Sequence, residues 1–486
     1  MAAPSKALPP VFSPHPAPQN QQTTNDPVAP RPAPATLDAA SRYFTETGHI
    51  VSGTLLTYYR SVPHSSELFG LPLSEEFTQR LGDGNTYSVQ YFERARLEEH
   101  PESATNPVQL GILTPLALHG RTFASVPAAK STPDRLYFPE TGHAIQGGFL
   151  EYWQTNGGIS ILGLPLSEEL VESGITVQYF ERARMEYRPD LQGTGYAIQL
   201  MPLGYEALKE GRFNIPMGTL ISFEPPHLGE GHTALLEVAA SSSLTVTGEY
   251  EGRPLLFAQM PGTDSKFTLV GAVPFADTGV RQVTVNLQNG DGGKRTVMRN
   301  IEIVHYPFPE EDLQFDAQTA ALLDPSLTQP ELTMLNQIFS GRTPTQYWHG
   351  LFRMPLDGKI TITSDFATRR CYNCPPGTPP TTYHGGMDMA AALGTPVHAP
   401  ADGKVVFSGK LNVRGNAIII DHGLGVYSLF AHNSKLIATV GQIVHKDDIV
   451  SLSGSTGLSN GPHLHWELHV SGPPVEPLEW VHRPLP

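Results

Sequence analysis

The C-terminal part of this 486-residue chain carries three short motifs whose side chains suit a metal centre. HGGMD holds His384 and Asp388, LFAH ends at His432, and GPHLHWE holds His463 and His465. Zinc takes imidazole and carboxylate ligands, and a catalytic zinc keeps three protein ligands and one position for water. His384, Asp388 and one histidine of the HLH pair satisfy that count, and the spacing leaves open which of the two it is.

The residues around these side chains predict how they are positioned. The two glycines between His384 and Asp388 permit a sharp turn, so both side chains can reach one ion from a loop. In HLHWE the two-residue period of a strand puts both histidines on one face, and Leu464 and Trp466 on the other. The two histidines are then roughly 6–7 Å apart, which suits one metal ligand and one neighbour that acts on water or substrate.

Each motif also has an ordinary structural explanation. HxxxD occurs by chance, and a His-x-His pair is more often a plain strand feature than a ligand pair. The joint occurrence of the motifs in one domain, each framed by glycines, favours a metal site. The other histidines of this region stand in no such motif and are interpreted as structural or surface residues: His398, His422, His445, His469 and His482.

With their surroundings, the motifs resemble the lysostaphin/LytM-type peptidoglycan endopeptidases, which have a duplicated hybrid motif fold. The likeness covers nearly all of Met354–Trp480 and is carried by HGGMDMAAALGTPVHAPADGKVV, GNAIIIDHGLGVYSLFAH and VGQIVHKDDIVSLSGSTGLSNGPHLHWELHV. It implies hydrolysis of peptide bonds in bacterial peptidoglycan, one bound Zn²⁺ ion, and action outside the cytoplasm or at the cell surface.

The resemblance also implies roles for the five side chains. His384 and Asp388 match the HxxxD ligands, and His465 matches the third zinc ligand, the second histidine of HxH. His432 and His463 match the two catalytic histidines that do not bind the metal. One of this pair would accept a proton from the activated water, and one would protonate the leaving amine.

Three positions depart from the family's pattern, and a loop is inserted just before the site. Phe430 stands where tyrosine is frequent, Asn433 where leucine is usual, and Ala367 where glycine is common. The inserted loop, CYNCPPGTPPTT, holds the only two cysteines, Cys371 and Cys374. One CxxC pair cannot complete a thiolate metal site, so a small loop disulfide is favoured over two free thiols.

Two other interpretations stay open. A non-catalytic member of the same fold would bind the cell wall or activate an amidase, although such members usually lack the zinc ligands that persist here. The stretches TPVHAPADGKVV and GQIVHKDDIV resemble half-motifs of biotinyl and lipoyl carrier domains. A carrier needs a lysine between apolar residues at a hairpin tip, and none stands between these halves.

The N-terminal half contains an internal duplication. TETGHIVSG, FGLPLSEE and VQYFERARLE return in the same order as PETGHAIQG, LGLPLSEE and VQYFERARME, which indicates one unit of about eighty residues used twice. We expect small α+β units at 37–123 and 132–211, with VQYFERARLE partly alternating as a half-buried strand does.

The two units resemble the LGFP-type repeats of bacterial surface proteins, which implies contact with cell-wall polymer. The alternative is that their aromatic residues form the core and the repeats are spacers. The aromatic residues concerned are Tyr58, Tyr59, Tyr91, Phe92, Trp153, Tyr179 and Phe180.

The remaining segments complete a mainly β, multidomain fold class. Residues 213–306 show short β-branched runs between Gly, Pro and Asp turns, which predicts an immunoglobulin-like β-sandwich. Residues 347–486 form the expected metallopeptidase domain, an antiparallel β-roll or sheet.

Residues 307–346 are predicted to be a helical linker between these two domains. Pro330 is expected near a helix start, with Leu332, Leu335 and Phe339 on one face.

Composition restricts the partners. The formal net charge of −15 argues against nucleic acid as the main partner, because phosphate binding needs a basic face. No apolar run approaches the ~18–20 residues that a membrane helix requires. Residues 1–36 lack the apolar core, roughly 7–15 residues, of a signal peptide, and are expected to be a flexible Pro-rich tail.

Overall fold

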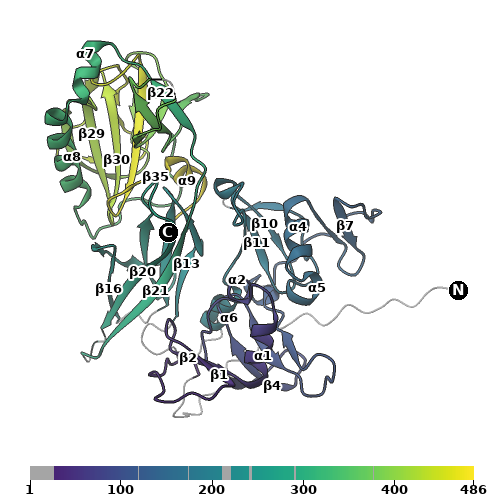
Figure 1. Cartoon of the computed structure of the whole chain (residues 1–486). Coiled ribbons are helices and arrows are strands. Elements are labelled where there is room, and N and C mark those ends of the chain that lie inside the picture. The colour runs from purple at the N-terminus through teal and green to yellow at the C-terminus, as the bar shows by residue number, and fades with distance from the viewer. Residues whose placement is uncertain are drawn as a thin grey trace.

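The structure, a computed structural model, describes residues 27–486 except 119, 173, 211–219, 240–243, 289, 291 and 376. Most of the predicted N-terminal tail therefore lies outside the described residues, as does the predicted boundary between the second repeat and the central domain. The elements are mostly short strands in several separate sheets, so the predicted mainly β, multidomain class is confirmed. Figure 1 shows the C-terminal domain at the top, a β-sandwich below it and the two repeats beside the sandwich.

The two N-terminal units have the same order of elements. The first contains β1 (Ser41–Phe44), β2 (His49–Ser52), α1 (Gly53–Ser61), α2 (Ser65–Leu68), β3 (Phe77–Arg80), β4 (Thr86–Tyr91), β5 (Arg96–Glu99), β6 (Val108–Leu110) and α3 (Thr114–Ala117). The second contains β7 (Arg135–Phe138), β8 (His143–Gln146), α4 (Gly147–Thr155), α5 (Gly158–Ile161), β9 (Leu170–Glu172), β10 (Ile175–Tyr179), β11 (Arg184–Tyr187), a 3₁₀ turn (Pro189–Leu191), β12 (Ile198–Leu200) and α6 (Leu203–Glu210). In each unit a β-hairpin and two short helices precede a four-stranded sheet.

The segment VQYFERARLE is a hairpin and not a single strand. β4 ends at Tyr91, the Phe92 N–H donates to the Ala95 carbonyl at 2.8 Å, and β5 begins at Arg96. The prediction of one alternating strand was wrong because Phe92–Ala95 form a tight turn, from which the charged Glu93 and Arg94 bond to other segments.

These turns join the two units reciprocally. Arg94 Nε donates to the Leu200 carbonyl at 3.3 Å in the second unit, and Arg182 Nε donates to the Leu110 carbonyl at 3.0 Å in the first. Both units contribute to one hydrophobic core. Of the aromatic residues singled out above, all but the half-buried Tyr58 are buried, which favours the interpretation that they are core residues.

The central domain consists of two sheets packed face to face, as predicted for a β-sandwich. One sheet has the order β13 (Leu220–Glu224), β15 (Thr233–Ala239), β19 (Lys266–Gly271), β18 (Ala258–Gln259). The other has the order β14 (His227–Gly229), β21 (Lys294–Val304), β20 (Gly279–Gln288), β16 (Thr245–Tyr250), β17 (Arg253–Leu255). Alternate residues of their long strands fill the core between the sheets.

The predicted helical linker is only partly helical. It contains a strand, β22 (Glu310–Leu313), then α7 (Ala317–Ala320), a 3₁₀ turn (Ala321–Leu323) and α8 (Pro325–Phe339). α8 begins at Pro325 with Asp324 as its N-cap, so Pro330 lies inside the helix and not near its start. A capping carboxylate followed by proline is a stronger start signal than a later proline alone.

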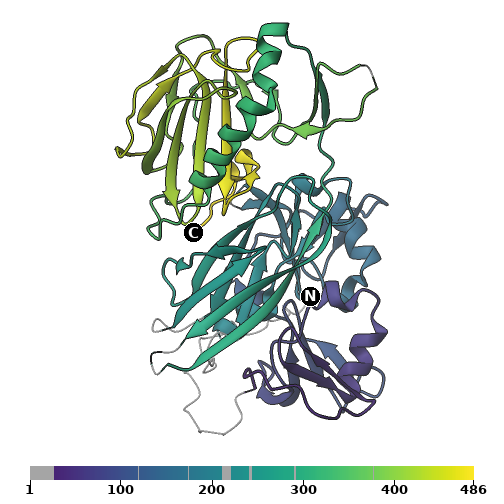
Figure 2. The ribbon, with the colours of Figure 1, turned by 60° about the vertical axis from the view of Figure 1, so that its left-hand side comes forward.

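α8 covers one face of the C-terminal domain (Figure 2). Its buried positions are Glu331, Leu335 and Phe339, whereas Leu332 is 41% exposed. The buried face therefore includes the carboxylate of Glu331 in place of the neighbouring Leu332, which was predicted to be there.

The C-terminal domain is built on an eight-stranded sheet whose strand pairs are antiparallel, as predicted. Its order is β23 (Ile362–Ser364), β26 (Met387–Ala390), β34 (His463–Val470), β30 (Val426–Asn433), β29 (Asn416–Gly423), β28 (Gly403–Lys410), β32 (Ile443–Val444), with β35 (Pro474–Val475) on β34. A smaller sheet holds β27 (Pro396–His398), β33 (Ile449–Leu452) and β31 (Lys435–Leu436), and the short helix α9 (Pro477–His482) ends the domain.

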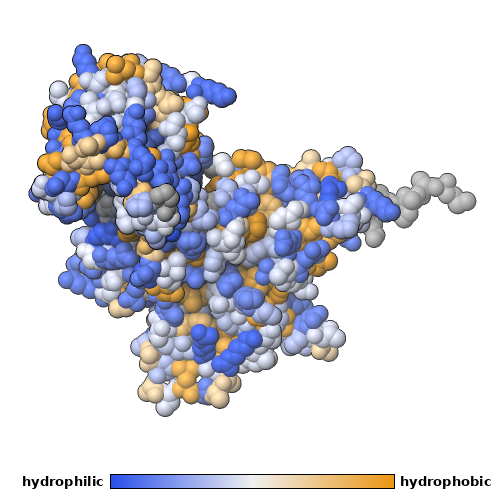
Figure 3. Space-filling view, turned by 45° about the horizontal axis from the view of Figure 1, so that its top comes forward, coloured by the Kyte–Doolittle hydropathy of each residue, from blue (hydrophilic) through white to orange (hydrophobic). Residues whose placement is uncertain are grey.

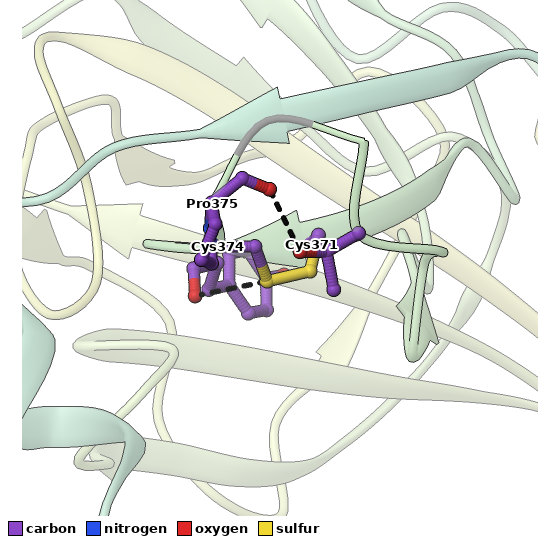
Figure 4. Close-up of a disulfide and its surroundings, with 5 residues drawn as sticks. Cys371, Cys374 and Pro375 are labelled. Atoms are coloured by element: carbon purple, nitrogen blue, oxygen red, sulfur yellow. Dashed lines mark hydrogen bonds between the residues drawn. A yellow bond between two sulfur atoms is a disulfide. The ribbon is translucent and has the colours of Figure 1, made fainter.

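The cysteine-containing loop belongs to a third small sheet. β24 (Arg369–Tyr372) pairs with β25 (Thr382–Tyr383) and, in parallel, with β22. Cys371 on β24 forms a disulfide with Cys374, as the sequence favours (Figure 4). The disulfide thus lies at the end of β24, the strand that pairs with β22 of the linker segment.

Among the described residues, no helix is long and apolar enough to cross a membrane. On the face that Figure 3 shows, hydrophobic and hydrophilic residues are interspersed over the described part of the chain.

Candidate metal centre

Three neighbouring strands bring the three motifs together. In the order β26, β34, β30, Asp388 is directly opposite His465, and Ala431 is opposite His465 on the other side. His384 lies just before β26, and His432 lies near the end of β30. Leu464 and Trp466 are fully buried on the opposite face of β34, so the predicted alternation of this strand is confirmed.

His384, Asp388 and His465 form a compact set of ligand atoms. His384 Nε2 is 3.1 Å from Asp388 Oδ1, His465 Nδ1 is 2.8 Å from the same oxygen, and the two nitrogens are 2.9 Å apart. These are the three residues that the family resemblance implies as ligands, and their donor set of two imidazoles and one carboxylate suits zinc.

Hydrogen bonds behind the two histidines fix which nitrogen faces Asp388. His384 Nδ1 donates to the Asp365 carbonyl at 2.9 Å, and His465 Nε2 donates to Glu467 Oε1 at 3.0 Å. The opposite nitrogen of each ring is left with a lone pair for a cation. Such outer partners are typical of metal-binding histidines, because they set the tautomer and hold the ring.

The other two histidines lie beside this set. The rings of His432 and His463 are 4.8 Å apart between centroids, and His463 Nε2 is 3.6 Å from Asp388 Oδ1. His432 Nδ1 donates to the Thr456 carbonyl at 2.7 Å, and His463 Nδ1 donates to the Gly461 carbonyl at 2.8 Å. The structure therefore brings all five predicted side chains into one place.

Glycine at 386 is required by a close approach. A Cβ atom there would lie 2.3 Å from the Trp466 carbonyl oxygen, whereas neither Gly385 nor Gly386 has a positive φ. The expected role of the two glycines as a sharp turn is thus corrected: Gly386 lets the HGGMD segment lie directly against β34. The left-handed residue at this site is His432, with a φ of 60°.

The electrostatics favour a neutral His384, a neutral His432 and an ionised Asp388. Burial lowers the pKa of His384 to about 4 and that of His432 to about 3. Burial alone would raise the pKa of Asp388, but His384 and His465 outweigh it and hold the pKa well below its usual range. Burial would lower the pKa of His465, but its hydrogen bonds to Asp388 and Glu467 raise it. Metal binding needs neutral histidines and an anionic aspartate, so a bound ion would have to displace the proton that the raised pKa of His465 favours.

The five side chains line a cleft of about 460 Å³. One wall comes from β22 and the residues that follow it, with Glu311, Leu313 and Phe315. Tyr372 and Tyr383 of the small disulfide-bearing sheet also line the cleft. The cleft is therefore lined by aromatic and apolar side chains as well as polar ones, as is usual in sites for organic ligands.

Sequence reasoning missed the charged residues that surround the ligands. Glu467 accepts from His465 and is also bound by Arg414 Nε at 2.6 Å and by His469 Nε2 at 2.8 Å. Strand alternation could have found Glu467, since it follows His463 and His465 on the same face. Arg414 and Arg370 stand in no motif, and no local pattern marks them.

Most of the other histidines have structural contacts. The buried His422 donates from Nδ1 to the Asp402 carbonyl at 2.8 Å and lies 2.9 Å from the Ser428 hydroxyl, as expected of a structural residue. His469 stacks on Phe339 of α8, with ring centroids 3.6 Å apart. His469 is thus linked to the site through Glu467.

The three departures from the family's pattern leave the five side chains in place. Phe430 is fully buried against Trp466, away from the cleft. Asn433 is also fully buried, and its amide donates to the carbonyls of Asn416 and Phe430. Ala367 has a φ of 54°, a conformation that favours glycine.

Comparisons with known proteins identify the family of the C-terminal domain. Residues 382–477 match the model of peptidase family M23. The C-terminal domain is an M23 peptidase domain. The chain is 39% identical over 127 residues to peptidoglycan DD-endopeptidase ShyA of Vibrio cholerae, which is 26% of this chain and 29% of that protein. It is 45% identical over 95 residues to DD-carboxypeptidase/endopeptidase Mpg of Neisseria meningitidis, which is 20% of this chain and 22% of that protein.

A solved structure gives a further comparison for the M23 domain. The catalytic domain of lysostaphin from Staphylococcus simulans is 26% identical, with 31% of this chain and 96% of that chain covered and a TM-score of 0.20. The chain spans less than a third of the length of either curated relative.

Proposed function

We propose that this protein is a zinc-dependent endopeptidase that hydrolyses peptide bonds in bacterial peptidoglycan. The observation that carries the proposal is the convergence of His384, Asp388 and His465 with His432 and His463 in the cleft of an M23 domain. The names of the similar proteins, which include peptidoglycan DD-endopeptidases, support the choice of substrate. Such a substrate places the site of action outside the cytoplasm.

The residues present fit zinc. His384 Nε2, Asp388 Oδ1 and His465 Nδ1 would hold the ion, because their other polar atoms are engaged by the protein. When bound, zinc lowers the pKa of water towards neutrality and polarises the carbonyl of a peptide bond.

His432 and His463 would handle the protons. Neither histidine belongs to the set of three ligand residues, but both line the same cleft. Each uses Nδ1 to donate to a backbone carbonyl, which holds the ring and leaves Nε2 to accept a proton. One histidine would take a proton from the attacking water, and one would deliver a proton to the leaving amine.

The test separates metal binding from catalysis. We expect His384→Ala and Asp388→Ala to lose both bound zinc, measured by elemental analysis, and hydrolysis of purified cell walls. His432→Ala and His463→Ala should keep most of the zinc but lose at least 100-fold in rate, in line with the loss of a proton-transfer group. His445→Ala is a matched control, because this histidine is exposed at the surface. Normal hydrolysis by the His463→Ala variant would refute the assigned role.

A non-catalytic wall-binding or amidase-activating protein is the alternative. The complete set of five side chains argues against it, and a zymogram on cell walls with and without chelator distinguishes the two. The proposed contact of the N-terminal repeats with wall polymer is a separate prediction. The aromatic residues that suggested it are mostly buried, so a binding surface would use other residues of the repeats.

A further inference from the structure

Arg370 contacts the carboxylate of Asp388 on the side away from the two histidines. Its Nη2 atom is 3.2 Å from Asp388 Oδ2, whereas His384 and His465 are close to Oδ1. The Arg370 side chain is only 10% exposed, so this contact is largely shielded from water. The two oxygens of Asp388 are thus divided between a guanidinium and the proposed metal position.

Arg370 is in turn held by two side chains. Its Nη2 atom donates to the Ser364 hydroxyl at 2.8 Å, and its Nε atom is 3.4 Å from Glu311 Oε2. Ser364 also donates to Glu311 Oε2 at 3.0 Å. The parallel pairing of β22 with β24 puts Glu311 directly opposite Arg370. The guanidinium therefore has a fixed position and a neutralising partner.

This arrangement extends beyond the segment that matches the M23 family. The match begins at residue 382, whereas Arg370 and Ser364 precede it and Glu311 lies on β22 of the linker segment. The Cys371–Cys374 disulfide also begins on β24, directly after Arg370. Ser364 of β23 and Glu311 of β22 thus meet at Arg370 of β24, which itself contacts Asp388 Oδ2.

We propose that Arg370 is a positioning residue that holds Asp388 with one oxygen available to the metal, and that Glu311 of the linker segment fixes Arg370 for this task. A bare arginine next to a cation site would repel the ion. Glu311 offsets that charge, so the guanidinium can orient the ligand without weakening the site. The inference rests on the proposed metal centre and adds that the linker segment completes it.

Zinc affinity, measured by competition with a chromophoric chelator in the full-length protein, tests this inference without any peptidoglycan. We expect Arg370→Ala to weaken zinc binding 10- to 100-fold, the usual effect of removing an outer partner of a metal ligand. Arg370→Lys keeps the charge and one donor, so it should restore part of the affinity. Glu311→Gln should also weaken binding, because it leaves the charge of Arg370 without its partner.

The neighbouring residue provides the control. Arg369 is 45% exposed and lies beside Glu310, so Arg369→Ala removes the same charge from the same strand without touching Asp388. It should bind zinc like the wild type. In the cobalt-substituted protein, the visible spectrum of Arg370→Ala should change, because the freed carboxylate can bind through both oxygens, whereas that of Arg369→Ala should not.

Two results would overturn the inference: wild-type zinc affinity in a folded Arg370→Ala protein, or an equal loss in Arg369→Ala. If Arg370→Ala does not unfold cooperatively, the Arg370→Lys and Glu311→Gln proteins decide, and wild-type affinity in both would also overturn it. These results differ from those expected if only the proposed function were wrong. In that case zinc affinity would still change in the Arg370 and Glu311 variants, but the wild-type protein would not hydrolyse cell walls.

Discussion

At the scale of single residues, Ala367 shows how a departure from the family's pattern can be tolerated at a cost. Its φ of 54° lies in the left-handed region, and its N–H donates to the His384 carbonyl at 2.8 Å. A residue with a Cβ atom in this conformation costs roughly 1–2 kcal/mol of folding free energy. Glycine avoids this strain, but it loses more conformational entropy on folding, which offsets part of the gain.

We therefore expect Ala367→Gly to stabilise the C-terminal domain by about 0.5–1 kcal/mol, the strain relieved less the entropy of the unfolded glycine. The midpoint of urea unfolding, followed by tryptophan fluorescence, measures this. Ala391→Gly, at a partly buried position without a positive φ, should instead destabilise or leave the domain unchanged. A lower midpoint for Ala367→Gly would contradict the assignment of strain.

His422 gives a pH dependence outside the metal centre. Burial lowers its pKa to about 4, against 6.5 in the unfolded chain. Below pH 6.5 the unfolded state binds the proton more readily than the folded state, so stability is complete above 6.5 and is lost as the pH falls towards 4. The loss from this residue is at most roughly 3 kcal/mol.

The His422→Gln variant isolates this contribution, since glutamine can replace both hydrogen bonds but does not titrate. The unfolding free energy of the wild type should fall relative to that of the variant from pH 7 to pH 4. A difference that stays constant over this range would show that His422 does not carry the effect.

At the scale of elements, α8 is an internal support of the cleft and not a passive connection. Glu331, almost fully buried on its inner face, accepts from the Val413 N–H at 2.8 Å and lies 3.2 Å from Arg414 Nη1. Arg414 lines the cleft and binds Glu467, which in turn holds His465. A chain of buried charges thus runs from the helix to the metal set.

Glu331→Ala should destabilise the domain by about 3 kcal/mol, because it leaves Arg414 buried with one carboxylate partner fewer. Cell-wall hydrolysis should fall as well, since Glu467 and His465 lose a fixed neighbour. Leu332→Ala is the matched control on the same helix: its side chain is exposed, and its effect on stability should stay within about 0.5 kcal/mol. Equal effects of the two substitutions would refute the role of Glu331.

At the scale of the whole molecule, Glu479 on α9 joins three domains. It accepts from the Thr233 N–H of the sandwich at 2.9 Å, pairs at 2.9 Å with Arg483, the residue after α9, and lies 3.7 Å from Arg188 of the second repeat. The side chain is 7% exposed. Figure 1 shows α9 where the C-terminal domain meets the sandwich.

We expect Glu479→Gln to loosen this junction, because it removes one anionic neighbour of the buried Arg483 and Arg188. Hydrogen exchange at the Thr233 amide should accelerate at least tenfold, whereas amides of β34 should keep their protection. Glu151→Gln, at an exposed position on α4, should change neither. Uniform acceleration across all domains would indicate global destabilisation instead.

The motifs HGGMD, LFAH and HLH, with their resemblance to a known family, were enough to name the five side chains of the candidate centre. The two-residue period of a strand predicted that His463 and His465 share a face, whereas the roles of the five side chains came from the family resemblance, and the geometry of HGGMD depends on its contact with β34. Local composition also predicted the sandwich, the disulfide and the duplicated units.

The residues that surround those side chains could not be predicted from the motifs. Glu311, Glu331, Arg370 and Arg414 come from segments that carry no metal motif, and their partners are set by strand pairing and helix packing between distant parts of the chain. The hairpin at FERA and the strand β22 were missed for the same reason, since both are stabilised by contacts with other segments. A buried charge is explained by its partner, and sequence spacing does not specify a partner that is far away in the chain.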